Sequence, residues 1–177
     1  FAPVVMSLVV ISILWLYLLN PNNGLLNALL NKIGISSQPF LTSPKQAMYA
    51  IVFVSAWQGA GYQMLLFLGG MQDIYEAAEL DGFSKWAQFR YITMPLLKPT
   101  ALFVLLTTLI SAFKLIVQPM VMTQGGPLNS TITMVYYIYQ QGFTDRLVGY
   151  SSSIALVFTT LIGMISLVQR RVLKEDD

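Results

Sequence analysis

The sequence predicts an all-α, polytopic membrane protein with four transmembrane helices. Of its 177 residues, 55% are hydrophobic and only 10% are charged, whereas soluble domains carry about 25% charged residues. Four stretches approach or exceed the roughly 20 apolar residues that a membrane-spanning helix needs. None alternates in polarity as a membrane-spanning strand would. In hydrocarbon the backbone must satisfy its own hydrogen bonds, so these stretches are expected to be helices.

The four predicted spans cover about residues 2–19, 46–70, 100–121 and 151–168. The first carries no charge and ends at the turn signal Asn20-Pro21-Asn22-Asn23-Gly24. The third contains one charge, Lys114, and the fourth stops at Gln169-Arg170-Arg171. Between them lie one charged loop, 71–98, and two longer loops, 20–45 and 122–150.

The distribution of Lys and Arg predicts the orientation of the chain. Positive side chains in short connections favour the cytoplasmic side. Six Lys or Arg residues lie in loop 71–98 and after residue 168, whereas three lie in loops 20–45 and 122–150. Loop 71–98 and the C-terminus are therefore expected in the cytoplasm, and the other two loops outside.

Composition also excludes several classes of function. The chain has no cysteine and no histidine, so disulfides, thiol nucleophiles, imidazole bases and ordinary zinc sites are excluded. Its net charge of +2 is small and dispersed, which argues against a nucleic-acid partner. The clustered acids Asp73, Glu76, Glu79 and Asp81 suggest an Mg²⁺-dependent enzyme, but no second acidic cluster faces them in the sequence.

Loop 71–98 carries the pattern of two short helices. Good helix formers fill residues 72–80, and Asp81-Gly82 ends that helix because glycine takes the left-handed conformation without steric cost. Ser84 can cap a second helix over 85–92, which places Trp86 and Phe89 on one side. Pro95 is expected to close it. On these grounds alone, a docking element and an ordinary solvated loop fit equally well.

The spacing within this loop is that of a known motif. Glu76-Ala77-Ala78 is followed by Gly82, Ile92 and Pro95 at the intervals of the EAA motif, with Met94 where that motif has leucine. The chain thereby resembles permease subunits of bacterial ABC importers. "TQGGPLNSTITMVYYIYQQGF" (123–143) and "APVVMSLVVISILWLYLLNPNNGLLNALL" (2–30) resemble the carbohydrate-uptake subfamily, to which the maltose and glycerol-3-phosphate permeases belong.

In two respects the sequence departs from the family's usual pattern. By resemblance, two N-terminal spans of the family are missing from this chain. "GGMQDIYEAA" also reaches the EAA motif about one helical turn sooner than the family usually does.

The resemblance implies a division of labour. The loop corresponds to a coupling helix that docks on a separate ATP-hydrolysing subunit. Its implied contact residues are Glu76, Ala77, Ala78, Asp81, Gly82, Ile92 and Pro95. The sequence has no G-x-x-x-x-G-K-[ST] motif, so the chain is expected to be no enzyme and to hold no cofactor, with ATP and Mg²⁺ bound by partner subunits.

The resemblance also implies partners and a location. The partners are a second permease subunit, two ATP-binding cassette subunits and an external solute-binding protein, besides membrane lipid. The location is the bacterial inner membrane. The solute is expected to be a carbohydrate or related polar molecule; the EAA motif also serves importers of other solutes. A secondary transporter is the alternative of another class, but the four predicted spans hold no Asp or Glu for ion coupling.

Two sets of residues are candidates for a solute path. Thr107, Ser111, Lys114 and Gln118 recur at helical spacing and form one polar stripe on the third span. Lys114 lies about 10 Å from the outer end of the predicted helix. It either snorkels to the interface or pairs with another helix, or it lines the path with Ser111 and Gln118.

The second set lies in "WQGAGYQ" on the second span: Trp57, Gln58, Gly59 and Tyr62. Aromatic rings and amides suit the C–H surfaces and hydroxyls of a sugar. By resemblance to the maltose permease, Gln58, Gly59 and Tyr62 match positions that line its sugar site. A plain packing interface, with glycines for close helix approach, fits the same residues.

Overall fold

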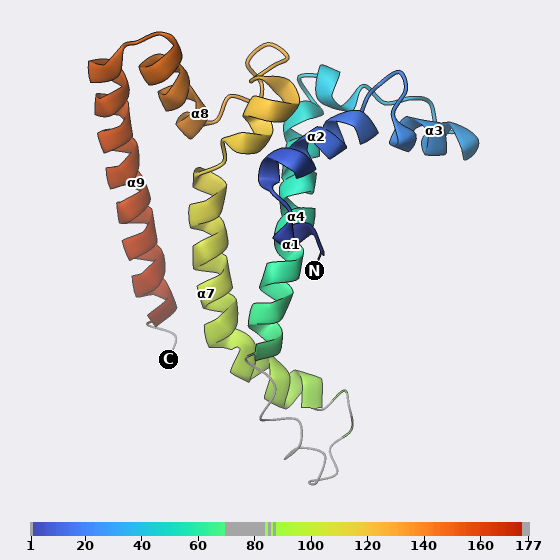
Figure 1. Ribbon diagram of the computed structural model, residues 1–177. Coiled ribbons are helices and arrows are strands. Elements are labelled where there is room, and N and C mark those ends of the chain that lie inside the picture. Colours follow the sequence, from blue (N-terminus) through green and yellow to red (C-terminus); the bar gives the residue numbers. More distant parts are fainter. Residues whose placement is uncertain (1, 70–83, 85, 87, 175–177) are drawn as a thin grey trace.

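The computed structural model describes residues 2–69, 84, 86 and 88–174, and this part of the chain contains helices and no strands. Three helices are long and apolar enough to cross a membrane: α4 (Ala47–Gly69), α7 (Met94–Phe113) and α9 (Val148–Lys174), the last through Gln169. They stand side by side, with the start of α7 and the C-terminus at the same end (Figure 1). The predicted all-α membrane architecture is confirmed.

The first predicted span, 2–19, is not one helix. The structure has α1 (Ala2–Val5) and α2 (Leu8–Leu18) instead, because Ser7 takes the extended conformation at φ −60° and ψ 135°. The 11 residues of α2 reach about 16 Å, roughly half of the hydrocarbon thickness. Hydropathy located this apolar run correctly, but it does not show the break.

The third predicted span, 100–121, is displaced toward the N-terminus. A π-helical segment, η2 (Gln88–Thr93), runs directly into α7, so Pro95 begins the span and does not close the preceding helix. Proline is tolerated in the first turn because its missing N–H would have no partner there. Pro99 lies inside α7. In Figure 1 this end of the helix lies across the foot of α4 and then bends upward, as helices do at prolines.

At its other end α7 stops at Phe113, eight residues before the predicted boundary at 121. The hydroxyl of Thr133 donates to the carbonyl of Leu115, so this carbonyl is bound by a side chain distant in sequence. The chain then forms a second π-helical segment, η3 (Pro119–Thr123). Periodicity could not reveal this end, because the contact that accompanies it is tertiary.

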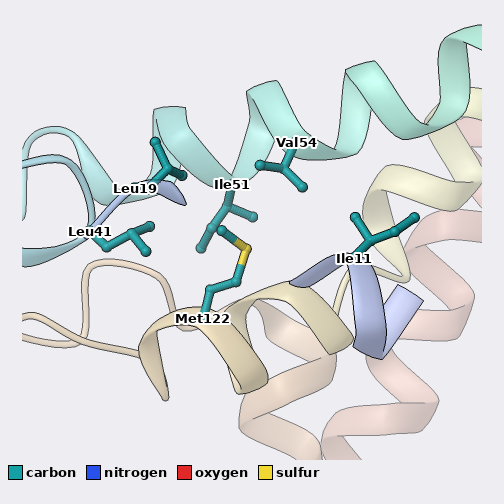
Figure 2. Close-up of a cluster of buried hydrophobic side chains, with 6 residues drawn as sticks. All are labelled: Ile11, Leu19, Leu41, Ile51, Val54 and Met122. Carbon is teal, nitrogen blue, oxygen red and sulfur yellow. The ribbon is translucent and has the colours of Figure 1, made fainter. Parts of the chain in front are cut away.

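The segments outside the spans gather at one end of the molecule, which we call the outer end (Figure 1). They include α3 (Leu25–Lys32), η1 (Phe40–Thr42), α8 (Met134–Tyr139) and η4 (Gln140–Thr144). The main hydrophobic cluster joins α2, η1, α4 and η3 there (Figure 2). Its buried members are Ile11, Leu19, Leu41, Ile51, Val54 and Met122.

The spans themselves are little covered by the rest of the chain. Only 11% of the apolar window of α4 and 6% of those of α7 and α9 are buried. A soluble protein could not expose so much apolar surface. These faces therefore require lipid or other membrane helices around them.

The predicted turn after the first apolar run is present. Oδ1 of Asn20 accepts the N–H groups of Asn22 (3.0 Å) and Asn23 (3.2 Å). A Cβ added to Gly24 would lie 2.4 Å from the carbonyl oxygen of Asn20 and 2.6 Å from that of Leu18. These are backbone atoms, so only glycine fits at this position.

Asn27 fastens the outer loop that follows. Its side chain is 2% exposed. Its Nδ2 donates to the carbonyls of Pro21 (3.1 Å) and Gln38 (2.9 Å), and its Oδ1 accepts the N–H of Gln38 at 2.9 Å. One buried amide thus joins the two ends of this loop.

Replacing Asn27 with alanine is expected to destabilise the outer end. Partly buried backbone groups of Pro21 and Gln38 would lose their partner, at a cost of about 2–3 kcal/mol in the free energy of unfolding. Thermal unfolding in detergent measures the effect. Asn31, one turn along α3, is exposed, and among the described residues its side chain bonds only to the Ser37 hydroxyl. Asn31→Ala is the control, and equal unfolding temperatures for both variants would contradict the role of Asn27.

Candidate functional site

Most of the predicted coupling residues, Glu76, Ala77, Ala78, Asp81 and Gly82, lie outside the described residues. The described part of the loop leads into the membrane: Ile92 belongs to η2 and Pro95 to the first turn of α7. The rings of Trp86 and Phe89 stack with their centroids 6.0 Å apart, which agrees with the predicted shared side. Trp86 is 75% exposed. An exposed aromatic pair therefore lies at the end of the molecule opposite the outer end, which we call the inner end.

On α4, Trp57 belongs to an aromatic cluster with α2. Its ring meets that of Trp15 edge to face with centroids 5.4 Å apart, and the ring of Phe53 also meets Trp15 edge to face, at 5.5 Å. The indole Nε1 of Trp15 is buried without a hydrogen-bond partner among the described residues. Sequence analysis missed Trp15, because no periodic pattern shows which span it packs against.

Gln58 and Tyr62 lie on another side of α4. Tyr62 is five residues from Trp57, about 140° around a helix, and it is 53% exposed. Gln58 is one turn before Tyr62 and half-buried. The structure therefore does not bring Trp57 together with Gln58 and Tyr62 as one surface.

Gly59 lies within an uninterrupted helix. A Cβ added there would touch only Nε2 of Gln63, at 3.8 Å, which is an ordinary contact. Among the described residues, nothing approaches Gly59 closely enough to require glycine.

A direct polar contact links α4 and α7 near these residues. Nε2 of Gln63 donates to the hydroxyl of Thr108 at 2.9 Å. Gln63 follows Tyr62, and Thr108 lies one turn before Ser111. The candidates Tyr62 and Ser111 are thus each within one turn of the place where the two spans are joined. Thr108 had no distinguishing signal in the sequence, because the register of the two spans is a tertiary property.

The polar stripe of the third span does not continue along one helix. The hydroxyl of Thr107 bonds to the carbonyls of Phe103 (3.0 Å) and Val104 (3.1 Å), and that of Ser111 bonds to Thr107 at 2.8 Å. Lys114 is the exposed C-cap of α7, and Gln118 is 5% exposed at the start of η3. The end of α7 at Phe113 therefore separates Gln118 from the other three residues.

Two open grooves run between the spans. One of about 500 Å³ lies between Phe67 of α4 and the stretch Ala101–Ala112 of α7. The other, of about 420 Å³, lies between Leu109 of α7 and Met164–Gln169 of α9. Both are almost entirely apolar. Their walls suit lipid chains or membrane helices better than a polar solute.

Aromatic side chains connect α8, η4 and α9 at the outer end. Tyr136 is 6% exposed, and the rings of Tyr139 and Phe143 stack at 5.2 Å. A hydrogen bond with Tyr150 raises the pKa of the Tyr137 hydroxyl above its usual value. These contacts link α8 and η4 to the start of α9, which is compatible with the predicted place of this segment at the outer interface.

The spans that the structure describes carry few charged side chains. No group of three or more His, Cys, Asp or Glu side chains among them could hold a metal ion. The three spans contain no Asp or Glu. Polar contacts within them come from hydroxyls and amides.

Comparison with known proteins decides the family. The family described as "Binding-protein-dependent transport system inner membrane component" matches residues 2–174. The chain belongs to this family. Its three membrane-length helices agree with an inner-membrane component, and the resemblance drawn from the EAA spacing is confirmed at the level of the family.

Two relatives of this family member illustrate the similarity. The chain is 37% identical over 98% of its length to "Probable ABC transporter permease protein YurN" of Bacillus subtilis (strain 168), of which it covers 62%. It is 35% identical over 96% of its length to "Lactose transport system permease protein LacF" of Rhizobium radiobacter, of which it covers 59%. The chain thus spans about three fifths of the length of these relatives.

Two solved structures share the fold. A bacterial ABC transporter involved in the import of the acidic polysaccharide alginate has a chain with a TM-score of 0.83 at 22% identity, covering 99% of this family member and 63% of that chain. A bacterial alginate ABC transporter in complex with an alginate pentasaccharide-bound periplasmic protein gives a TM-score of 0.75 at 25% identity, covering 97% and 60%.

Proposed function

We propose that this chain forms the membrane-spanning part of a permease subunit in an ATP-driven, binding-protein-dependent importer. The observation that carries the proposal is the family match over residues 2–174. The three apolar spans supply the membrane domain that such a subunit needs. A proton-driven secondary transporter is disfavoured, because these spans contain no acidic side chain.

The proposed solute is a sugar or related polar molecule. Relatives carry the names of lactose and arabinooligosaccharide transport systems, which supports a carbohydrate. The exposed Tyr62 and the half-buried Gln58 on α4 offer a ring and an amide, the groups that bind sugar C–H surfaces and hydroxyls. The residues that we place along the path are Tyr62, Gln58, Gly59, Ser111 and Lys114. Trp57, which packs against Trp15, and the buried Gln118 support the path. A non-carbohydrate polar solute is the alternative.

The proposed drive comes from partner subunits. We assign Glu76, Ala77, Ala78, Asp81, Gly82, Ile92 and Pro95 to the contact with an ATP-binding cassette subunit, and ATP with its Mg²⁺ to two such subunits. A second permease subunit and an external solute-binding protein complete the assembly. This assignment places the end that holds the start of α7 and the C-terminus (Figure 1) in the cytoplasm, in line with the positive charges there.

A pull-down of the full-length tagged protein in mild detergent tests the assembly. We expect it to recover an ATPase carrying a G-x-x-x-x-G-K-[ST] motif, a second EAA-bearing membrane protein and a solute-binding protein. A protein that came down alone and transported solute without ATP would contradict the proposal.

Glu76→Lys is expected to release the ATPase subunit from this complex. Reversing the charge replaces a carboxylate contact with a repulsive one, which costs several kcal/mol at an interface. Glu79→Lys makes the same change of charge in the same loop at a position that the EAA spacing leaves free. ATPase recovery is therefore expected to fall for Glu76→Lys alone, and equal recovery from both variants would exclude Glu76 from the contact.

A further inference from the structure

We propose that Leu128 is a docking contact for the external solute-binding protein. Leu128 lies in the glycine–proline loop, residues 124–131, between η3 and α8 at the outer end. The inference rests on the proposed function and adds to it the point of contact on this chain. Four features support it: the exposure of Leu128, its polar flanking residues, the backbone conformation at the tip of the loop, and the contacts that hold the loop in place.

Leu128 is the most exposed of the large hydrophobic side chains that the structure describes. It is 89% exposed, more than any large hydrophobic residue described in the spans. Its neighbours Gln124 and Asn129 are exposed and polar. Irregular backbone that faces lipid would leave its polar groups unsatisfied, so the loop belongs outside the hydrocarbon. An apolar tip with polar flanks in water favours a protein partner.

The backbone at this tip takes an unfavourable conformation. Leu128 has φ 52° and Asn129 has φ 59°, both in the left-handed region. Asparagine tolerates this region, whereas most other side chains lose about 1–2 kcal/mol there. Leucine therefore gains nothing locally from its position, neither burial nor a relaxed backbone. Such outliers cluster at sites of binding.

The loop holds this conformation through its own hydrogen bonds. Thr131 is fully buried, and its hydroxyl oxygen lies 2.7 Å from that of Thr123. The N–H of Thr131 donates to the carbonyl of Gly125 (3.2 Å), and that of Ser130 to the carbonyl of Pro127 (3.1 Å). A loop fixed in this way loses little conformational entropy when a partner binds.

The base of the loop is tied to the rest of the fold. Gly125 is buried at φ 83°, and a Cβ there would lie 2.8 Å from Cγ1 of Ile132 and 3.2 Å from Cε1 of Tyr136. Just before the loop, Met122 enters the hydrophobic cluster shared with α2 and α4 (Figure 2). Leu128 thus lies at the tip of a loop whose base is held by packing.

The occupant that fits is a soluble protein with a small apolar pocket on the outer side of the membrane. The loop lies at the end of the molecule opposite the start of α7 and the C-terminus (Figure 1), which the proposed function places in the cytoplasm. In the proposed assembly the solute-binding protein is the component that approaches from the outside.

The test uses the full-length transporter in nanodiscs and the solute-binding protein recovered with it. The measurement is the concentration of that protein giving half-maximal stimulation of ATP hydrolysis. Leu128→Gly removes the side chain and keeps the left-handed backbone, which glycine adopts freely. We expect the half-maximal concentration to rise about tenfold or more, while the unfolding temperature is equal to that of the wild type or higher.

Asn129→Gly is the matched control, because it relaxes the neighbouring left-handed residue and leaves the leucine in place. We expect its half-maximal concentration of solute-binding protein to equal that of the wild type. If Leu128→Gly also titrated like the wild type, the docking contact would be overturned while the proposed function stood. A lower unfolding temperature for Leu128→Gly with unchanged stimulation would reassign the side chain to packing or lipid. A wild-type transporter that no solute-binding protein stimulates would overturn both.

Discussion

Replacing Gly82 with proline is expected to abolish solute uptake while leaving the protein in the membrane. The sequence predicts that Gly82, after Asp81, takes the left-handed conformation at the turn between the two predicted helices of the coupling loop. Proline fixes φ near −65° and removes an N–H, a change that costs about 3 kcal/mol in a helix. If the coupling contact loses this amount, uptake falls about a hundredfold or more. Uptake of labelled solute into proteoliposomes measures it.

Two other substitutions separate the turn from the side chain. Asparagine tolerates the left-handed conformation, so Gly82→Asn is expected to retain most of the uptake, and Gly82→Ala to lie between asparagine and proline. ATP hydrolysis without solute transport in Gly82→Pro would identify uncoupling directly. Normal uptake in the proline variant would remove this turn from the coupling mechanism.

Replacing Tyr62 with alanine is expected to weaken transport without releasing the ATPase subunits. Tyr62 is 53% exposed beside the Gln63–Thr108 contact that joins α4 and α7. Loss of its ring and hydroxyl from a solute contact is expected to raise the transport KM about tenfold, the effect of about 1.4 kcal/mol. Uptake kinetics measured over a series of sugars provide the test.

The same helix offers a control for this variant. Tyr49 is 78% exposed near the outer start of α4 and is not one of the predicted path residues. Tyr49→Ala is expected to transport normally, which separates a path contact from the general loss of an exposed tyrosine. Tyr62→Phe removes the hydroxyl and keeps the ring, so it separates the contributions of these two groups to transport. Identical kinetics for Tyr62→Ala and the wild type would place Tyr62 outside the path.

Much of this fold follows from hydropathy and local turn chemistry. The apolar runs around α4, α7 and α9 are long enough that only membrane-spanning helices satisfy their backbone. The turn at Asn20–Gly24 was predictable because asparagine side chains bond to nearby N–H groups and only glycine fits beside the carbonyls. These features depend on residues close together in the chain.

The features that the sequence did not predict depend on distant contacts. The break at Ser7 separates α1 from α2 within a run that hydropathy treats as continuous. The end of α7 accompanies the bond from Thr133 to Leu115, 18 residues away. This end also divides the polar stripe that helical spacing had placed on one face. Helical spacing predicts which residues share a face of a helix, but it does not show where the helix ends.

The candidate site shows the same contrast between what the sequence predicts and what depends on distant contacts. The EAA spacing predicts coupling residues through resemblance to a family; the match confirms the family, and the coupling residues remain a prediction. The path residues on α4 were predicted from chemical type and from resemblance to the maltose permease, and the structure places Trp57 against Trp15 and Tyr62 elsewhere on the helix. Side-chain type predicts what a residue can bind, whereas the register between helices determines what it meets.

The bent helix made of η2 and α7 has two arms. Its short arm lies across the foot of α4 at the inner end, and its long arm is the span itself (Figure 1). Thr93, which joins the π-helical segment to α7, keeps helical angles of φ −63° and ψ −49°, so the backbone has no extended residue at this junction. A sideways push on the short arm would therefore rotate and tilt the long arm. Over the 20 residues of α7, a tilt of a few degrees moves the far end by about 2 Å.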